Sequence, residues 1–235
     1  MEKKMGELLT KEKQIVVPGE VLATGMDYLP AGGAFREDDN IISCQLGIVN
    51  LSGRLIKVVP LGGPYIPKKG DTVIGRVADM TYSSWFVDVG YAYEASLTMK
   101  EATSAFVPRG AELTNFFKIN DLVVGKLINV TKSKAMDLTM RGPGLRKLQG
   151  GKVILVPAPK VPRVVGKMGS MINMIKEMTG CQVIAGQNGR IWISGTDPVK
   201  ERIAEEAVLL IAAESHISGL TDRVKDFIAK NGEKK

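Results

Sequence analysis

The chain has 235 residues, of which 44% are hydrophobic, and carries a formal net charge of +7, so it holds enough apolar material for two or three folded modules. No stretch approaches the roughly 18 uninterrupted apolar residues of a membrane span, and the opening MEKKMGELLTKEKQ lacks the apolar centre of a signal peptide. These features argue against a membrane protein, and we expect a cytoplasmic chain without a membrane partner.

Residues 1–68 are predicted to form a separate small β domain. The segments IVVPGEVLATG, IISCQLGIVNLSG and RLIKVVPLGGPYIPKKG read as short strands connected by turns rich in glycine and proline. Positive and negative charges nearly balance in this region. We therefore expect it to dock on protein rather than to grip nucleic acid.

Residues 69–143 are predicted to form a small β-barrel. Five strand-like segments follow one another, TVIGRVADM, WFVDVG, EASL, LVVGKLINVT and AMDLTM. Five strands suit an OB-type barrel, in which Gly75 and Gly125 would relieve crowding where the strands coil. The stretches GDTVIGRV, WFVDVG, INDLVVGKLINV and MDLTM resemble an S1-type RNA-binding domain, although ASLTMKEATSAFVPRGAELTNFFK replaces the histidine-containing stretch usual in that family.

Aromatic residues cluster around the second barrel strand, where an exposed ring could stack on an unpaired base. Trp85 and Phe86 must face opposite ways, so part of the cluster belongs to the core, which is the commoner role for any single ring. We expect Tyr82 and Trp85 to face outward. Arg76 and Lys126 are their expected phosphate partners.

The segment RGPGLRKLQGG, residues 141–151, is the clearest boundary in the chain. Its glycines predict flexibility, and its cations attract phosphate. We therefore expect RNA that passes between modules to touch Arg141 and Arg146.

Residues 150–235 contain a GxxG turn between two helical patterns. Gly166 and Gly169 lack a Cβ, so the backbone can turn sharply and lie against a sugar-phosphate chain, while Lys167 and Met168 stand between them. Ser170 then opens a helix whose N-terminal amides would face a phosphate. Taken alone, a GxxG is often only a glycine-rich turn.

The residues after the turn favour a nucleic-acid interpretation. Gly180 ends the helix, 181–185 and 190–194 alternate as strands, and Asp197-Pro198 starts a further helix. This order, strand-helix-GxxG-helix-strand-strand-helix, is the layout of a KH domain. A phosphate-binding P-loop is rejected because it needs a longer glycine spacing. A short amphipathic C-terminal helix is expected in GLTDRVKDFIAKNGEKK.

Basic residues are concentrated in the segment 151–195. They are Lys152, Lys160, Arg163, Lys167, Lys176 and Arg190, against the single acid Glu177. Phosphates attract such clusters, so we expect Arg163, Lys176 and Arg190 to contact RNA together with the loop. A basic surface that only keeps the protein soluble is the alternative.

The predicted fold class is multidomain β and α+β, with a small N-terminal β domain, an S1-type OB-fold barrel and a KH domain extended by C-terminal helices. In this order the modules resemble the RNA-binding cap subunit of the archaeal exosome, of the S1-KH type. The stretches IVVPGEVLA, LSGRLIKVVPL, YIPKKGD and VGKMGSMI carry this resemblance.

The resemblance implies a non-catalytic partner of a nuclease. In that family, three cap proteins sit on a hexameric ring of RNase PH-like subunits, which cleaves RNA by 3′-to-5′ phosphorolysis. The cap recruits single-stranded RNA and guides it to the pore. The N-terminal domain is then expected to dock on the ring.

The residues themselves also predict no enzyme and no cofactor. The single histidine, His216, lies near the end of a helical pattern, where histidine is usually structural. Asp38 and Asp39 lack other residues at metal-ligand spacing. Cys44 and Cys181 lie in different modules and form no C-x-x-C pair, which argues against zinc or a disulfide framework.

Two other classes of function stay open from the sequence. A transcription or translation factor could combine S1 and KH modules, although such factors usually carry a second KH domain. A self-contained ribonuclease is the third interpretation, although the phosphorolytic domains that accompany S1 and KH modules in polynucleotide phosphorylase are absent from this sequence.

Overall fold

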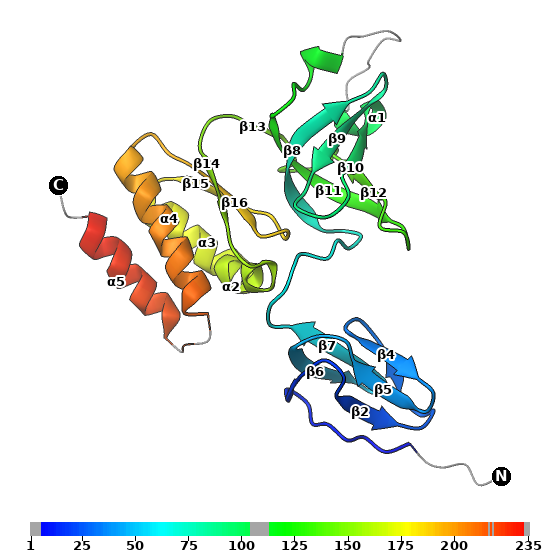
Figure 1. Ribbon diagram of the computed structural model, residues 1–235. Coiled ribbons are helices and arrows are strands. Elements are labelled where there is room, and N and C mark those ends of the chain that lie inside the picture. The colour runs from blue at the N-terminus through cyan, green and yellow to red at the C-terminus, as the bar shows by residue number, and fades with distance from the viewer. Residues whose placement is uncertain (1–5, 104–112, 216, 218, 233–235) are drawn as a thin grey trace. The chain divides into compact units, whose positions relative to one another are not determined.

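The computed structural model describes residues 6–103, 113–215, 217 and 219–232 (Figure 1). The chain divides into two compact units, Met1–Gly63 and Pro64–Lys235. His216 lies outside the described residues.

The first unit is an all-β unit of two small sheets. One sheet has the order β1-β6-β7-β3 and the other the order β2-β5-β4. The strands are β1 (Ile15–Val16), β2 (Val21–Thr24), β3 (Leu29–Pro30), β4 (Ala34–Glu37), β5 (Asn40–Ser43), β6 (Gly47–Ser52) and β7 (Leu55–Pro60). Alternate apolar side chains of these strands form a small core, with Leu22, Ile41 and Ile56 fully buried.

The second unit begins with a closed five-stranded barrel. Its strands are β8 (Thr72–Met80), β9 (Ser84–Asp88), β10 (Ala95–Thr98), β11 (Leu122–Val130) and β12 (Met136–Thr139). They run in the order β8-β9-β10-β12-β11, with β10 and β12 parallel and β11 pairing back to β8. This is the OB-type arrangement that the strand pattern predicted. Two short helices, α1 (Met99–Ala102) and η1 (Leu113–Asn115), lie between β10 and β11.

The first unit ends shortly before the limit of 68 expected from the sequence, because Tyr65 belongs to the barrel. Its ring is buried in the barrel core, and its hydroxyl donates to the Asp71 carboxylate at 2.7 Å. Burial, followed by the hydrogen bond and the charge of Asp71, raises the pKa of Tyr65. The hydroxyl therefore stays protonated and keeps the segment attached to the barrel.

A KH-type layer follows the barrel. The sheet order is β14-β16-β15, all antiparallel, from β14 (Lys152–Leu155), β15 (Gln182–Ala185) and β16 (Arg190–Ser194). Figure 1 shows helices packed against one face of this sheet. Helices α2 (Val161–Val165), α3 (Ser170–Thr179) and α4 (Pro198–Ala213) contact the sheet, and α5 (Leu220–Gly232) packs on α3 and α4. The short helices η2 (Ala158–Lys160) and η3 (Lys167–Gly169) adjoin α2.

Local signals in the sequence set the ends of the KH helices. Gly180, in the left-handed conformation, ends α3, and the Asp197 side chain accepts a hydrogen bond from the Val199 amide at 2.9 Å to cap α4. Leu220, Val224 and Ile228 are buried on one side of α5, so the predicted amphipathic C-terminal helix is confirmed.

The face of the KH sheet that the helices leave open packs against the barrel. Trp192 and Ile184 of the sheet meet Ile74 and Val124 of the barrel in one apolar cluster. The connecting segment joins this cluster through Leu145 and Leu148.

The segment 141–151 is therefore not the flexible linker expected from its glycines. Strand β13 (Lys147–Leu148) pairs with β11, and the Val124 amide donates to the Arg146 carbonyl at 2.8 Å. Burial of two leucines between the barrel and the sheet outweighs the conformational freedom of the flanking glycines.

Two barrel glycines lie where a side chain would collide, as predicted. A Cβ on Gly125 would come 2.7 Å from the Leu138 Cγ, and one on Gly75 would collide with Val87. We expect Gly125→Ala to destabilise the second unit by about 1–3 kcal/mol, because the barrel wall must shift to make room. Chemical denaturation followed by circular dichroism measures this. Gly232→Ala, in open space at the end of α5, is the control and should change little. Equal effects of the two substitutions would contradict the crowding argument.

Candidate nucleic-acid interface

The GxxG turn lies between α2 and α3, and its two glycines are required for different reasons. Gly166 has φ 76° and ψ 172°, and a Cβ there would come 2.7 Å from the Met171 amide nitrogen. Gly169 adopts the left-handed conformation at φ 81° directly before α3. Crowding therefore excludes a side chain at Gly166, and backbone geometry favours glycine at both positions.

The residues between and after the glycines face solvent. Met168 is 96% exposed and has φ 54°, a left-handed conformation uncommon for methionine. Lys167 and Ser170 are also exposed. Among the described residues, no side chain caps the N-terminus of α3, and the Ser170 amide donates to the Lys167 carbonyl within the turn. A cation, an approachable backbone and the positive end of a helix together suit a phosphodiester.

The other predicted KH cations are placed differently. Arg163 is exposed on α2, and its Nη2 lies 3.4 Å from the Ile217 carbonyl oxygen. Lys176 is half-buried in the last turn of α3, roughly 9 Å along the helix axis from Ser170. The structure therefore places Arg163 on the helix leading into the loop and Lys176 at the remote end of the helix leaving it.

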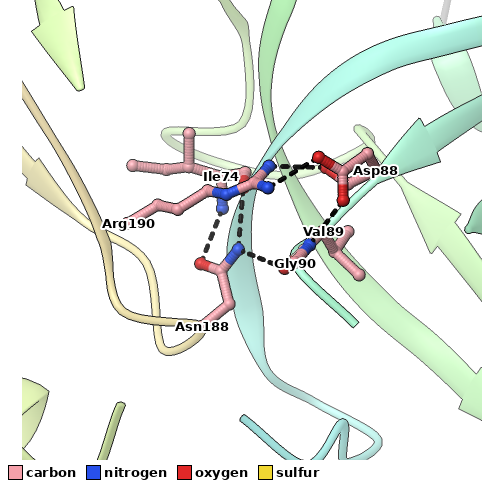
Figure 2. A network of polar contacts seen from close by, with 6 residues as sticks. All are labelled: Ile74, Asp88, Val89, Gly90, Asn188 and Arg190. Atoms are coloured by element: carbon pink, nitrogen blue, oxygen red, sulfur yellow. Dashed lines mark hydrogen bonds and ion pairs between the residues drawn. The ribbon is translucent and has the colours of Figure 1, made fainter. Parts of the chain in front are cut away.

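Arg190 does not present a free cation, which corrects the prediction that it contacts RNA. Its Nη2 pairs with the Asp88 carboxylate at 2.6 Å and its Nη1 donates to the Asp88 carbonyl at 2.7 Å (Figure 2). Only 16% of the Arg190 side chain is exposed. Because the fork of the guanidinium is filled by one barrel residue, Arg190 joins the KH sheet to the barrel.

The environment of Asp88 favours its charged form. Burial alone raises the pKa of Asp88, but hydrogen bonds from Arg190 and the Gly90 amide, with the charges of Arg190 and Arg76, outweigh burial and hold it below its usual value. The ion pair is therefore complete at neutral pH.

Trp85 is buried, and the prediction that it faces outward is wrong. It is 0% exposed, its Nε1 donates to the Phe117 carbonyl at 3.3 Å, and its ring meets that of Phe117 edge-on with centroids 5.1 Å apart. The opposite side of β9 carries Phe86, which is half-buried and lies across from Ser96 of β10. Phe86 is the outward ring on this strand, and sequence reasoning missed it.

The remaining barrel candidates do lie on the surface. Tyr82 is 90% exposed in the turn between β8 and β9, and Arg76 and Lys126 are exposed on β8 and β11. Arg76 lies opposite Asp88 of β9, whereas Lys126 lies opposite Thr72 of β8 and Thr139 of β12. These side chains are therefore available but are spread over several strands.

The cations of the connecting segment are exposed but engaged. The Arg141 Nε donates to the Thr103 carbonyl at 3.2 Å, and the Arg146 Nη2 donates to the Gln182 Oε1 at 3.0 Å. Arg146 thus bridges the connecting segment and the KH sheet. Each guanidinium retains further donors that could face a phosphate.

Among the residues that the structure describes, no group of three or more His, Cys, Asp or Glu side chains could hold a metal ion. Within the same residues, no helix is long and apolar enough to cross a membrane.

The fold and the exposed loop define a protein that combines an OB-type barrel with a KH domain, and a family profile described as KH domain matches residues 151–199. The exosome complex component Rrp4 of Thermococcus kodakarensis is 42% identical over 227 residues, which cover 95% of this chain and 88% of that protein. The Rrp4 of Methanothermus fervidus is 44% identical over 227 residues, covering 96% of this chain and 100% of its own length.

A solved structure agrees with these relatives. The crystal structure of an exosome complex RNA-binding protein is 32% identical with a TM-score of 0.65, and the match covers 72% of this chain and 98% of that one. This chain therefore belongs to the family of the exosome complex component Rrp4. The resemblance predicted from the sequence is confirmed.

We expect the double substitution Lys167→Asp and Met168→Asp to preserve the fold and weaken binding of single-stranded RNA at least tenfold at low salt, because it places carboxylates where a phosphate would lie. Fluorescence anisotropy across a salt series measures this, and the loss should shrink at high salt. The matched control is Val199→Asp with Lys200→Asp, which makes the same charge change on exposed residues of α4. Equal losses in both variants would show that net charge, not the loop, governs binding.

We also expect the ion pair between Asp88 and Arg190 to make the stability of the second unit depend on pH in the acid range. Because the pKa of Asp88 is lowered in the folded protein, its contribution is present above about pH 4 and is lost as pH falls through the folded pKa. Thermal unfolding of the wild type and of Asp88→Asn from pH 2 to pH 6 tests this. The wild type should be more stable at pH 6, and the difference should disappear at the acid end. A constant difference across the range would contradict it.

Proposed function

We propose that this chain is a non-catalytic, RNA-binding cap subunit of an exosome. It recruits single-stranded RNA and guides it to the pore of a hexameric ring of RNase PH-like subunits, three caps to a ring, for 3′-to-5′ phosphorolysis. The observation that carries the proposal is the exposed GxxG loop on a chain that aligns with Rrp4 over nearly its whole length. The relatives are named as exosome components, which supports a ring as partner.

The surface of the first unit supports a protein partner for that unit. Ten large apolar side chains are exposed among its described residues: Leu9, Ile15, Val17, Met26, Leu29, Phe35, Leu46, Leu55, Val59 and Leu61. Exposed apolar side chains mark a protein contact surface where they lie together, and this unit exposes many of them. The sequence of residues 1–63 carries seven Lys or Arg against eight Asp or Glu, which gives no attraction for phosphate.

In this proposal, cleavage belongs to the ring, and the chain contributes binding and delivery. RNA held at the GxxG loop and on the outer barrel surface has a raised local concentration at the pore. Single strands suit both contacts, because a backbone clamp and an exposed ring such as Tyr82 need unpaired nucleotides.

The test uses labelled single-stranded RNA of about 30 nucleotides, inorganic phosphate, and the ring with or without this chain. We expect the chain alone to leave the RNA intact and the ring with the chain to shorten it faster than the ring alone. The variant carrying Lys167→Asp and Met168→Asp should lose this stimulation, and the α4 control variant should retain it. The reason is that only the loop change removes the recruiting contact.

Two results would contradict the proposal. Shortening of RNA by the chain alone, after removal of contaminating nuclease by a second column, would mean that it carries its own catalytic centre. RNA binding without association with the ring, measured as mass by light scattering, would favour a transcription or translation factor. Three copies per ring is the expected stoichiometry in the same measurement.

A further inference from the structure

The barrel is closed, but the pairing of β8 with β9 does not reach the start of β8, which leaves a gap in the hydrogen-bonded wall. Strand β8 pairs with β11 from Thr72 onward, but it pairs with β9 only from Arg76, opposite Asp88. After Asp88 the chain turns away through Val89 and Gly90. The start of β8 therefore has no partner from the barrel on the β9 side among the described residues.

The turn between β15 and β16 of the KH sheet fills this gap. The Gln187 amide donates to the Thr72 carbonyl at 2.8 Å, and the Thr72 amide donates to the Gln187 Oε1 at 2.9 Å. These two bonds replace those that a neighbouring strand would make at Thr72.

Asn188 makes the corresponding bonds at Ile74 with its side-chain amide. Its Oδ1 accepts from the Ile74 amide at 3.2 Å, and its Nδ2 donates to the carbonyls of Ile74 and Val89, both at 2.8 Å (Figure 2). Asn188 is only 8% exposed. One side chain thus satisfies three backbone groups at the interface, as the peptide group of a paired strand would.

The residues around Asn188 hold it in this position. A Cβ on Gly186 would come 2.8 Å from the Ile74 amide nitrogen, so only glycine lets the turn approach β8 this closely. Two residues after Asn188, the Arg190 guanidinium pairs with the Asp88 carboxylate. Three residues of this turn therefore bond to the barrel, namely Gln187, Asn188 and Arg190.

We propose that Asn188 is a positioning residue that completes the barrel wall and thereby fixes the GxxG loop relative to the outer barrel surface. This inference rests on the proposed RNA-binding function and deepens it. The barrel and the KH domain then act as one rigid body with two RNA contacts at a constant separation. An RNA long enough to reach both gains affinity from the second contact without the cost of aligning two modules.

The amide of asparagine is specific for this task. An aspartate in its place would keep the acceptor for the Ile74 amide but would lose both donors and turn a carboxylate toward two carbonyl oxygens. Asn188→Asp therefore opposes the contact without changing the size of the side chain. The matched control is Asn50→Asp, which makes the same chemical change at an exposed position of β6 in the first unit.

The experiment compares two single-stranded oligonucleotides, a tetramer that spans the GxxG loop alone and a 20-mer that reaches the barrel as well. For the wild type and the Asn50→Asp control, we expect the 20-mer to bind far more tightly than the tetramer. For Asn188→Asp, tetramer affinity should stay unchanged, and the advantage of the 20-mer should fall on the order of tenfold. An unchanged advantage in a folded Asn188→Asp protein would overturn the proposal.

A spectroscopic measurement reports on the interface itself. Trp192 is 3% exposed in the apolar cluster between sheet and barrel, and Trp85→Phe leaves it as the single tryptophan. Asn188→Asp in this background should shift the Trp192 emission to longer wavelength, whereas Asn50→Asp should not. Emission that does not change would count against the proposal, because a loosened interface must admit water to this ring.

A measurement on the wild type covers the case in which Asn188→Asp does not fold. Nuclear spin relaxation of backbone amides gives the rotational correlation times of the barrel and of the KH domain in the full chain. Equal correlation times are expected, and clearly different ones would overturn the rigid-body inference. If the wild type binds neither oligonucleotide, the proposed RNA-binding function fails instead, whatever the relaxation data show.

Discussion

The second unit depends on the burial of one apolar sheet face. The KH helices cover only one side of β14, β15 and β16, and the other side carries Val153, Ile184 and Trp192. A sheet with such side chains facing water would be a strongly apolar exposed patch. The barrel covers them, and the polar groups at the margin are satisfied locally, for example by the bond from the Trp192 Nε1 to the Gly150 carbonyl at 2.9 Å. The barrel and the KH domain therefore keep their own cores and share the apolar cluster between them.

This burial also changes how the basic charge of residues 151–195 should be interpreted. Four of its six cations have a partner within the protein, and one of them is Arg163, which donates to the Ile217 carbonyl at 3.4 Å. Arg190 pairs with Asp88, Lys152 pairs with Glu205 at 2.7 Å, and the Lys160 Nζ donates to the Ala212 carbonyl at 2.7 Å. Charge counting finds where phosphates are attracted, but it does not separate cations that face RNA from those that hold the fold together. Lys167, beside two glycines in an exposed turn, is the better placed of the remaining two.

The sequence predicted elements well and side-chain direction less well. Alternation located β8 to β12 and both strands flanking Asn188, because strand periodicity is a local property. The same alternation shows that Trp85 and Phe86 face opposite ways but not which of them faces inward. That choice depends on Phe116 and Phe117, which reach Trp85 from the connection after β10, some 30 residues away. The burial of Leu145 and Leu148 in a glycine-rich segment is likewise decided by distant partners.

The shape of the GxxG loop is set by the protein itself. Gly166 is confined by the backbone of α3, Gly169 leads directly into that helix, and Met168 is held with φ 54° and its side chain in water. A non-glycine residue in this conformation costs about 1 kcal/mol, and no burial of Met168 offsets that cost. The two flanking helices must therefore impose it. Under the proposed function, a preformed loop on a KH sheet anchored to the barrel leaves the ordering cost of binding to the RNA, which favours single strands flexible enough to adapt to a fixed surface.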